Sequence, residues 1–346
     1  MLGKGSFGSV VADGDKAIKQ FKTMQHLVAE VFVTKYCSSN SPYVIELKGC
    51  SFKNLTMTSK RWHCSLDKAL ENNNLSLSQK QSIHCCVLKG LVHIEALHIV
   101  HADIKPANIL VDSTFTKAVI ADFGIASSSN RARVKQTSPA YSIRHDKAKS
   151  HRTHDQFSFV MLTLNLFYRY RTYKELTSRE ELRGVIRSVV TDKLLASVLL
   201  KLVQNDELEC CTAQEALKEL YKTKVTIPRP QFVLWSGASE KTTIVVNSYI
   251  TKLAEVFFPN KLERLKDCAM LLTGSLPVNT PKLTTYLCTL TYIFICVFGC
   301  SKVIRKEEKM SIGDITNLTG SNSSDIIGCL NTILSCQDLV SLMYAP

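Results

Sequence analysis

The stretch from His101 to Gly124, HADIKPANILVDSTFTKAVIADFG, constrains the fold of this chain more than any other segment. It contains two carboxylates, Asp103 and Asp122, and one amide, Asn108. Two short apolar runs, residues 109–111 and 118–120, flank polar residues and predict a β-hairpin. This hairpin returns Asp122 to the loop that holds the other two groups. Because such a set suits divalent metal ions and a hydroxyl nucleophile, the stretch predicts phosphoryl-transfer chemistry.

A second motif lies at the N-terminus, where residues 3–10 (GKGSFGSV) match the pattern GxGxxGxV. The same glycine spacing opens a helix in dinucleotide-binding folds, so the pattern alone is weak. Here it continues through Asp13-Gly14 into Lys16-Ala17-Ile18-Lys19, which predicts strand, tight turn and strand. A glycine-rich hairpin lets backbone N–H groups approach phosphates closely.

In this order the two motifs resemble the glycine-rich loop, catalytic loop and metal-binding loop of eukaryotic-type serine/threonine protein kinases. The resemblance covers residues 1–225 and implies an α+β, bilobal fold. A small β-rich N-lobe would span residues 1–58, a hinge residues 58–60, and a helical C-lobe residues 61–225. The chain is divergent and resembles the kinases of large DNA viruses, such as herpesvirus-like viruses.

The resemblance implies an ATP site in the small lobe. Lys19 would pair the α- and β-phosphates, and Glu30, in a predicted helix over residues 25–37, would be its ion-pair partner. The nucleotide would also contact the glycine-rich hairpin and the strands beside it. These residues are Leu2, Gly3, Lys4, Gly5, Ser6, Phe7, Gly8, Ser9, Val10, Ala17 and Met57.

The resemblance also assigns the reaction groups and the cofactors, ATP and Mg²⁺. Asp103 would be the catalytic base toward the substrate hydroxyl. Lys105 would contact the γ-phosphate and favours Ser/Thr acceptors. Asn108 and Asp122 would hold Mg²⁺, whose charge offsets that of the transferring phosphoryl group.

Three departures from the family pattern stand out. Ala102 replaces the arginine that gathers an activating phosphate, so phosphate-triggered ordering of the following loop is not expected. The usual Ala-Pro-Glu aligns with residues 143–145, Ile-Arg-His, and the arginine partner of its glutamate aligns with Cys210. Losing both halves of a buried ion pair together can be nearly neutral, whereas losing one costs about 3–5 kcal/mol.

Further elements follow from pattern. Residues 44–47 and 55–58 read as strands, and Ile83, Val87, Leu91 and Ile94 form one apolar helical face. Asp155 matches the helix residue that braces the catalytic loop. Other helices are predicted over residues 173–190, 192–203 and 212–217.

Charge and cysteine content bear on partners. The net charge of +13 favours anionic partners. Thirteen cysteines without a CxxC pair, several in apolar periodic segments, indicate reduced thiols and an intracellular, soluble protein. No specific nucleic-acid module is visible. Cations gather around a predicted docking loop at residues 138–141 and favour acidic or already phosphorylated protein substrates; they are Arg131, Arg133, Lys135, Arg144, Lys147, Lys149 and Arg152.

The C-terminal third reads as a linker, residues 226–243, followed by an all-α helical domain, residues 244–346. Residues 283–301 carry no charge, which suits either a helix buried on all sides or a membrane span. The buried helix is favoured and a membrane association is not expected. The helix order weakly resembles a cyclin box, although Leu330 stands where cyclins have a glutamate. Such a domain is expected to make a regulatory contact with the kinase domain.

The leading hypothesis is an ATP-dependent serine/threonine protein kinase. Two alternatives remain open. One is a catalytically dead kinase fold that serves as a scaffold, against which stands the presence of every expected catalytic group. The other is a basic nucleic-acid-binding protein, which only the net charge supports.

Overall fold

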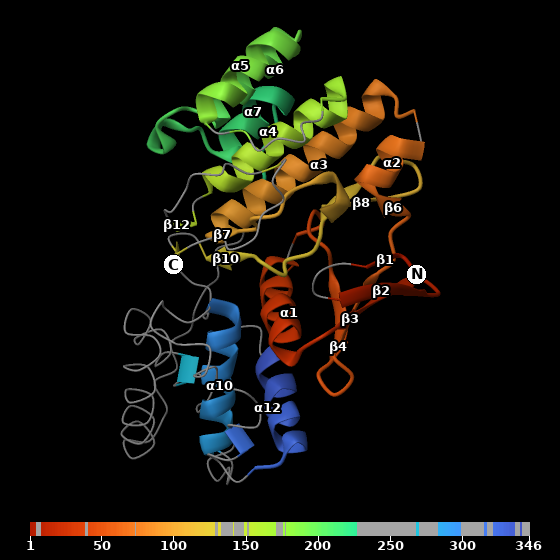
Figure 1. Ribbon diagram of the computed structural model, residues 1–346, viewed down its shortest axis with the longest axis vertical. Coiled ribbons are helices and arrows are strands. Elements are labelled where there is room, and N and C mark those ends of the chain that lie inside the picture. The colour runs from red at the N-terminus through yellow and green to blue at the C-terminus, as the bar shows by residue number, and fades with distance from the viewer. Residues whose placement is uncertain are drawn as a thin grey trace.

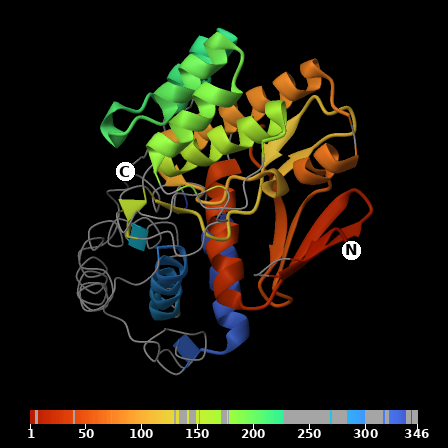
Figure 2. The same cartoon turned by 45° about the horizontal axis from the view of Figure 1, so that its top comes forward.

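The computed structural model describes residues 1–4, 8–38, 41–72, 74–128, 131–132, 141, 149–150, 152–170, 176, 178–226, 268–269, 283–298, 315–316, 321–335 and 340. Figure 1 shows a β-rich part that contains the N-terminus and a mostly helical part above it. Two later helices lie beside the β-rich part, and the tilted view of Figure 2 shows the same arrangement. The predicted linker, residues 226–243, lies outside the described residues except for Thr226.

The small lobe is a five-stranded antiparallel sheet in the order β1-β2-β3-β5-β4. The β2–β3 hairpin turns at Asp13-Gly14, as its sequence predicts, and Asp13 pairs with Lys16. Its strands are β1 (Gly3–Lys4), β2 (Gly8–Asp13), β3 (Lys16–Phe21), β4 (Leu47–Ser51) and β5 (Thr56–Lys60).

Two predicted boundaries in this lobe are wrong. Residues 44–46 are not part of a sheet strand, because Tyr43 and Ile45 instead exchange backbone hydrogen bonds with Ile120 of the other lobe. The fourth strand begins at Leu47. The fifth strand runs through Lys60, which pairs with Lys16, so the connection between lobes starts at Arg61 rather than within residues 58–60.

In the described part of the small lobe, the helix α1 (Met24–Ser38) packs against β3, β4 and β5. It coincides with the helix predicted over residues 25–37. Its C-terminal end is tied to the large lobe, where Nε2 of the buried His93 lies 2.9 Å from the Cys37 carbonyl oxygen. The helix that carries Glu30 is therefore anchored to both lobes.

The large lobe is built around α3 (Leu77–Ala96), which begins with a capping box between Ser76 and Gln79. The predicted apolar face of this helix is buried. Its other helices are α2 (Leu66–Asn72), η1 (Pro106–Asn108), α4 (Thr153–Tyr168), α5 (Arg179–Val189), α6 (Lys193–Leu202), η3 (Glu207–Glu209) and α7 (Ala213–Tyr221). The helix predicted from residue 173 begins at Arg179, because Ser178 caps it.

Short strands join these helices at the face turned toward the small lobe. The predicted hairpin is present, with Ile109 paired to Ile120 and Val111 paired to Ala118. The strands are β6 (Cys64–Ser65), β7 (Ile99–Val100), β8 (Ile109–Val111), β9 (Ala118–Ile120), β10 (Ser127–Ser128), β11 (Arg131–Ala132) and β12 (Lys149–Ser150).

In the C-terminal region the structure describes α10 (Leu283–Phe298) and α12 (Ser323–Ser335), which pack on each other. Side chains of α10 such as Leu287, Cys288 and Leu290 are buried. None of the helices in the described ranges has the length and apolar character that a membrane crossing requires. The likeness of this region to a cyclin box stays a prediction.

Candidate functional site

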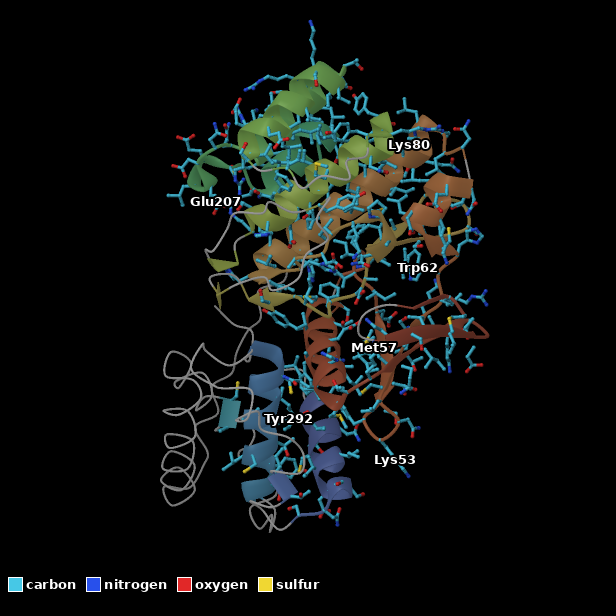
Figure 3. All side chains as sticks on the ribbon, viewed as in Figure 1. Lys53, Met57, Trp62, Lys80, Glu207 and Tyr292 are labelled. Carbon is cyan, nitrogen blue, oxygen red and sulfur yellow. The ribbon has the colours of Figure 1, made fainter. Side chains whose placement is uncertain are left out.

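The sheet register brings four of the predicted nucleotide-binding residues of the small lobe onto one face. Lys19 pairs directly with Val10 on β2 and with Met57 on β5, so these three side chains form one row across the sheet. Ala17 lies two residues before Lys19 and shares its face. Met57 is buried, at 5% exposed, which closes the inner end of the row. Figure 3 shows Met57 where the sheet faces the large lobe.

The glycine-rich hairpin is described at both of its ends. Gly3 and Lys4 pair with Val10 and Ser9, and the Leu2 N–H donates to the Val10 carbonyl at 2.8 Å. Gly8 is required by its surroundings, because a Cβ there would overlap the carbonyl oxygen of Gln20 on β3. The tip of the loop, residues 5–7 (Gly5, Ser6 and Phe7), lies outside the described residues.

Lys19 forms the ion pair with Glu30 that the sequence predicted. Its Nζ lies 2.7 Å and 2.6 Å from the two carboxylate oxygens of Glu30. The same Nζ lies 2.7 Å from Oδ1 of Asp122, which the sequence did not predict. The Lys19 side chain is 15% exposed and that of Glu30 1%, while Asp122 is 42% exposed. One ammonium therefore connects α1, β3 and the segment after β9.

Burial and charge act against each other in this cluster. Burial is the largest effect on Glu30 and raises the pKa of its carboxyl to about 7, against the opposing pull of Lys19. Burial also disfavours the Lys19 ammonium, but Glu30 and then Asp122 outweigh it and leave the pKa of Lys19 raised. Asp122 is likewise penalised by burial, yet Lys19 holds its pKa below the usual value. The charged form of Lys19 is thus the one that the site stabilises.

The loop between β7 and β8 gathers the other predicted catalytic groups. Oδ2 of Asp103 accepts hydrogen bonds from Lys105 Nζ at 2.7 Å and from Asn108 Nδ2 at 2.8 Å. The same amide nitrogen donates to the Asp103 backbone carbonyl at 2.9 Å. The Ala121 N–H donates to the Asn108 carbonyl at 2.9 Å, which places Asp122 next to this loop. The two acidic groups and the amide predicted from sequence are brought together.

Asp155 of α4 fixes the backbone of this loop. Its two oxygens accept the N–H groups of His101 at 2.6 Å and Ala102 at 2.8 Å. Burial raises the pKa of Asp155 to about 7, and the two N–H donors oppose that shift. Ala102 and Asp122 both have φ of 67°, a left-handed backbone that is costly for residues other than glycine. Strain of this kind is concentrated at functional sites, and here the Asp155 bonds help to hold it.

His101 is a neutral spacer within the same loop. Its Nε2 lies 3.0 Å from the Ala121 carbonyl, which only accepts, so Nε2 carries the proton. Its Nδ1 then accepts the Asp103 N–H at 3.2 Å. Burial lowers the pKa of this imidazole, in agreement with a neutral ring. His101 links Asp103 to the residue before Asp122 without adding a charge.

Comparison with known proteins agrees with this geometry. The protein kinase domain family matches residues 1–222, which is more than half of the chain. The chain belongs to the protein kinase family. A curated relative, serine/threonine-protein kinase pakH of Dictyostelium discoideum, is 34% identical over 150 residues. The match covers 36% of this chain and 27% of that relative, so it spans little more than a quarter of the relative's length.

The kinase domain implies ATP and, typically, Mg²⁺, and the side chains present fit both. Asn108 uses its amide nitrogen toward Asp103, which leaves its Oδ1 as the oxygen for a cation. Asp122 adds a carboxylate, and Mg²⁺ prefers hard oxygen ligands. Within the described residues no three His, Cys, Asp or Glu side chains form a metal site. Mg²⁺ is often held by one or two protein ligands together with substrate phosphates, and Asp122 and Asn108 would provide such ligands.

One member of the predicted basic cluster does not belong to it. Arg152 turns into the large lobe, where Nη1 lies 3.0 Å from Glu95 and Nη2 lies 3.0 Å from the carbonyl of Cys210. Glu95 also accepts the N–H of Ala213 at 2.9 Å. The sequence did not predict this ion pair. One feature of the sequence could have indicated it. The glutamate and arginine that form the family's usual ion pair are replaced by residues 145 and 210, so another cation could be expected beside Cys210.

Proposed function

We propose that the chain is an active, ATP-dependent serine/threonine protein kinase that transfers the γ-phosphate of Mg-ATP to protein hydroxyls. The observation that carries this proposal is a pair of charged clusters where the two lobes meet. Lys19, Glu30 and Asp122 form one, and Asp103, Lys105 and Asn108 form the other. A kinase fold that had lost its activity would have no need to keep both sets of charged groups in hydrogen-bonding geometry.

The roles follow from position and charge. Asp103 accepts or orients the proton of the substrate hydroxyl, and Lys105 beside it offsets charge on the transferred phosphoryl group. Lys19, held by Glu30, positions the α- and β-phosphates. Asn108 and Asp122 hold Mg²⁺, which when bound neutralises charge on the phosphate oxygens. Catalysis is then chiefly positioning and electrostatic stabilisation.

The decisive experiment is a kinase assay on the full chain with Mg-ATP and a mixed protein substrate. Asp103→Asn should abolish transfer while nucleotide binding is retained, because the amide cannot accept the proton. Asp192→Asn is the matched control, since Asp192 caps α6 and asparagine caps a helix about as well. Nucleotide binding without any transfer by the wild-type chain would instead favour the scaffold hypothesis.

We also propose that acidic or phosphorylated protein substrates are preferred. Arg152 is excluded from the supporting cluster by its pairing with Glu95. Arg131 and Lys149 lie on the paired strands β11 and β12, where Ala132 stands opposite Lys149. The other members of the cluster lie outside the described residues. The competing explanation is a solvated basic loop, since single exposed ion pairs contribute only about 0–1 kcal/mol each.

A degenerate peptide library tests this preference. Enrichment of Asp, Glu or phosphoserine near the acceptor, weaker at high salt, is the expected result because salt screens exposed charges. Replacing Arg131 and Lys149 with serine should reduce that enrichment, whereas replacing Arg152 should alter stability instead. Enrichment of Arg or Lys around the acceptor would contradict the proposal.

A further inference from the structure

The helix that carries Glu30 is enclosed along its whole length. Every residue of α1, from Met24 to Ser38, is buried or half-buried. At about 100° per residue, Val28 and Phe32 lie roughly opposite Glu30 on the helix, and both are fully buried. A helix that is apolar on all faces needs partners on all of them. The sheet covers the side of α1 that carries Glu30, where Lys19 makes the contact. Another element must therefore cover the opposite side of α1.

The second cover is α10, from the C-terminal region. It packs along α1, and Figures 1 and 2 both show α1 between the strands of the small lobe and α10. No residue of α10 carries a charge. The described side chains of this helix include Cys288, Leu290 and Ile293, none of which is exposed. Burial of apolar surface is therefore the main contribution that α10 can make to the stability of this contact.

The same helix also reaches the segment that follows Asp122. α10 packs against β10, which starts at Ser127, five residues after Asp122. β10 in turn pairs with β7, whose last residue, Val100, precedes His101. α10 therefore contacts both the helix with Glu30 and the strand next to the metal-binding loop. α1 carries Glu30, one of the two carboxylates that hold Lys19, and β10 follows the other, Asp122, by five residues.

We propose that α10 is a built-in positioning element, which holds α1 and β10 so that Glu30 and Asp122 both reach Lys19. The inference rests on the proposed kinase function and deepens it, because it assigns the regulation of that site to the chain's own C-terminal region. An outward shift of α1 would separate Glu30 from Lys19. Ala102 has no charge with which to order this region around a phosphate, so apolar packing by α10 takes that role.

Two tyrosines of α10 allow a matched test. The hydroxyl of Tyr286 lies 3.5 Å from Thr332 Oγ1, so Tyr286 is directed toward α12. Tyr292, six residues later, lies about 240° further round the helix and is 3% exposed. Tyr292 therefore lies on another side of α10 from Tyr286, and Figure 3 labels it where α10 runs beside α12. Tyr292→Ala removes a buried ring from that side, and Tyr286→Ala is the control on the same helix.

The experiment is hydrogen exchange on the full chain without nucleotide, together with kinase kinetics. Tyr292→Ala should lower exchange protection about tenfold or more in α1 and β10 and leave α5 and α7 unchanged. Its kcat should fall by at least a similar factor, while Tyr292→Phe should restore both. Tyr286→Ala should lower protection within α10 and α12 only. If the variant does not accumulate, Ile293→Val should show the same selective pattern at a smaller size.

The outcomes separate this inference from the proposed function. Loss of protection in α10 with unchanged protection of α1 would overturn the positioning role. A uniform loss across α3, α5 and α7 would also overturn it, because α10 would then be a general structural support. An inactive wild-type chain would overturn only the proposed function, since hydrogen exchange reports on α1 without any phosphoryl transfer.

Discussion

At the scale of single residues, Lys19 is the point on which the site depends. Its ammonium contacts both Glu30 and Asp122, and these come from different lobes. The sequence predicted its pairing with Glu30, because that carboxylate lies alone within an apolar helix. It could not predict the bond to Asp122, 103 residues away, because no local pattern encodes the closure of one lobe on the other.

Removing either charge from this cluster should abolish activity. We expect Lys19→Met and Asp122→Asn each to lower kcat by about 10²–10³ or more, the usual effect of losing one electrostatic contact in a site. The fold should persist in Lys19→Met, because Glu30 has a raised pKa and takes up a proton instead of remaining as a buried lone charge. Steady-state kinetics and circular dichroism measure the two effects.

Lys16→Met is the matched control for the lysine, because Lys16 is exposed and lies on the same strand. It should keep nearly full activity. Near wild-type turnover by Lys19→Met would show that the lysine has been assigned wrongly.

Arg152 is a residue whose position in the fold could not be predicted from the sequence pattern. Seven cations surround the predicted docking loop, and nothing in their spacing distinguishes the one that folds inward. Its ion pair with Glu95 and its bonds to the Cys210 and Cys211 carbonyls depend on how α4 meets α7 and α3. The divergent chain thus has an ion pair near the place where the family's usual one is absent.

At the scale of elements, the catalytic loop and its hairpin followed directly from the sequence. The spacing of the polar groups and of the two apolar runs predicted a β-hairpin after the catalytic loop. The pairing of Ile109 with Ile120 confirms this hairpin. The strand predicted over residues 44–47 was wrong for a different reason. Val44 and Ile45 suit a strand by composition, but their partner is Ile120 in the other lobe, and strand propensity does not specify a partner.

The segment after Asp122 should work without phosphorylation. Ala102 presents only a methyl group where the family pattern has an arginine, and Asp155 already holds the backbone of the loop. Phosphatase treatment should therefore leave kcat within about twofold of its starting value, since no phosphate-binding contact is lost. Mass spectrometry would verify removal of phosphate from Ser127, Ser128, Ser129 and Thr137.

Substitution of Ser127 and Ser128 by alanine is the matching genetic control for this prediction. Complete loss of activity after dephosphorylation, regained only on rephosphorylation of these residues, would contradict it.

A buried histidine network in the large lobe should make the fold sensitive to acid. His84 of α3 lies 2.6 Å from the Tyr221 hydroxyl and 2.9 Å from that of Thr163, which donates to the Phe159 carbonyl. Nε2 therefore carries the proton and the ring is neutral. Burial lowers the pKa of His84 to about 3.

Because this pKa is depressed on folding, the neutral ring contributes stability that is present above about pH 6.5 and lost as pH falls toward 3. Between about pH 7.5 and pH 5.0 this loss should reach about 2 kcal/mol. Urea unfolding of the wild type and of His84→Gln at both pH values isolates the contribution of His84. The raised pKa values of Glu30 and Asp155 change the stability in the opposite direction, but they do so equally in both proteins and cancel in the comparison.

His63→Gln is the control for that measurement, because the His63 side chain is exposed. Its free energy of unfolding should follow the wild-type pH dependence. An equal pH dependence in wild type and His84→Gln would show that His84 does not contribute.

At the scale of the whole molecule, the sequence predicted two lobes and a helical region after them, but not how that region packs. An uncharged helix such as α10 must be buried, and its composition does not say against what. The complementary signal lies in α1, whose apolar residues occupy every face. Two helices that each lack a polar face are natural partners, although only the fold shows that they meet.

This packing predicts a reciprocal effect of nucleotide on the C-terminal region. If α10 favours the arrangement in which Glu30 reaches Lys19, a ligand that favours the same arrangement must stabilise α10 by an equal free energy. Mg-ADP or a non-hydrolysable ATP analogue should therefore slow hydrogen exchange in α10 as well as in α1, by about 5-fold or more at saturation. Lys19→Met, which lacks the linking cation, should lose the effect in α10 even at nucleotide concentrations that saturate it. Slower exchange in α1 with no change in α10 would show that the two helices are packed together but not coupled.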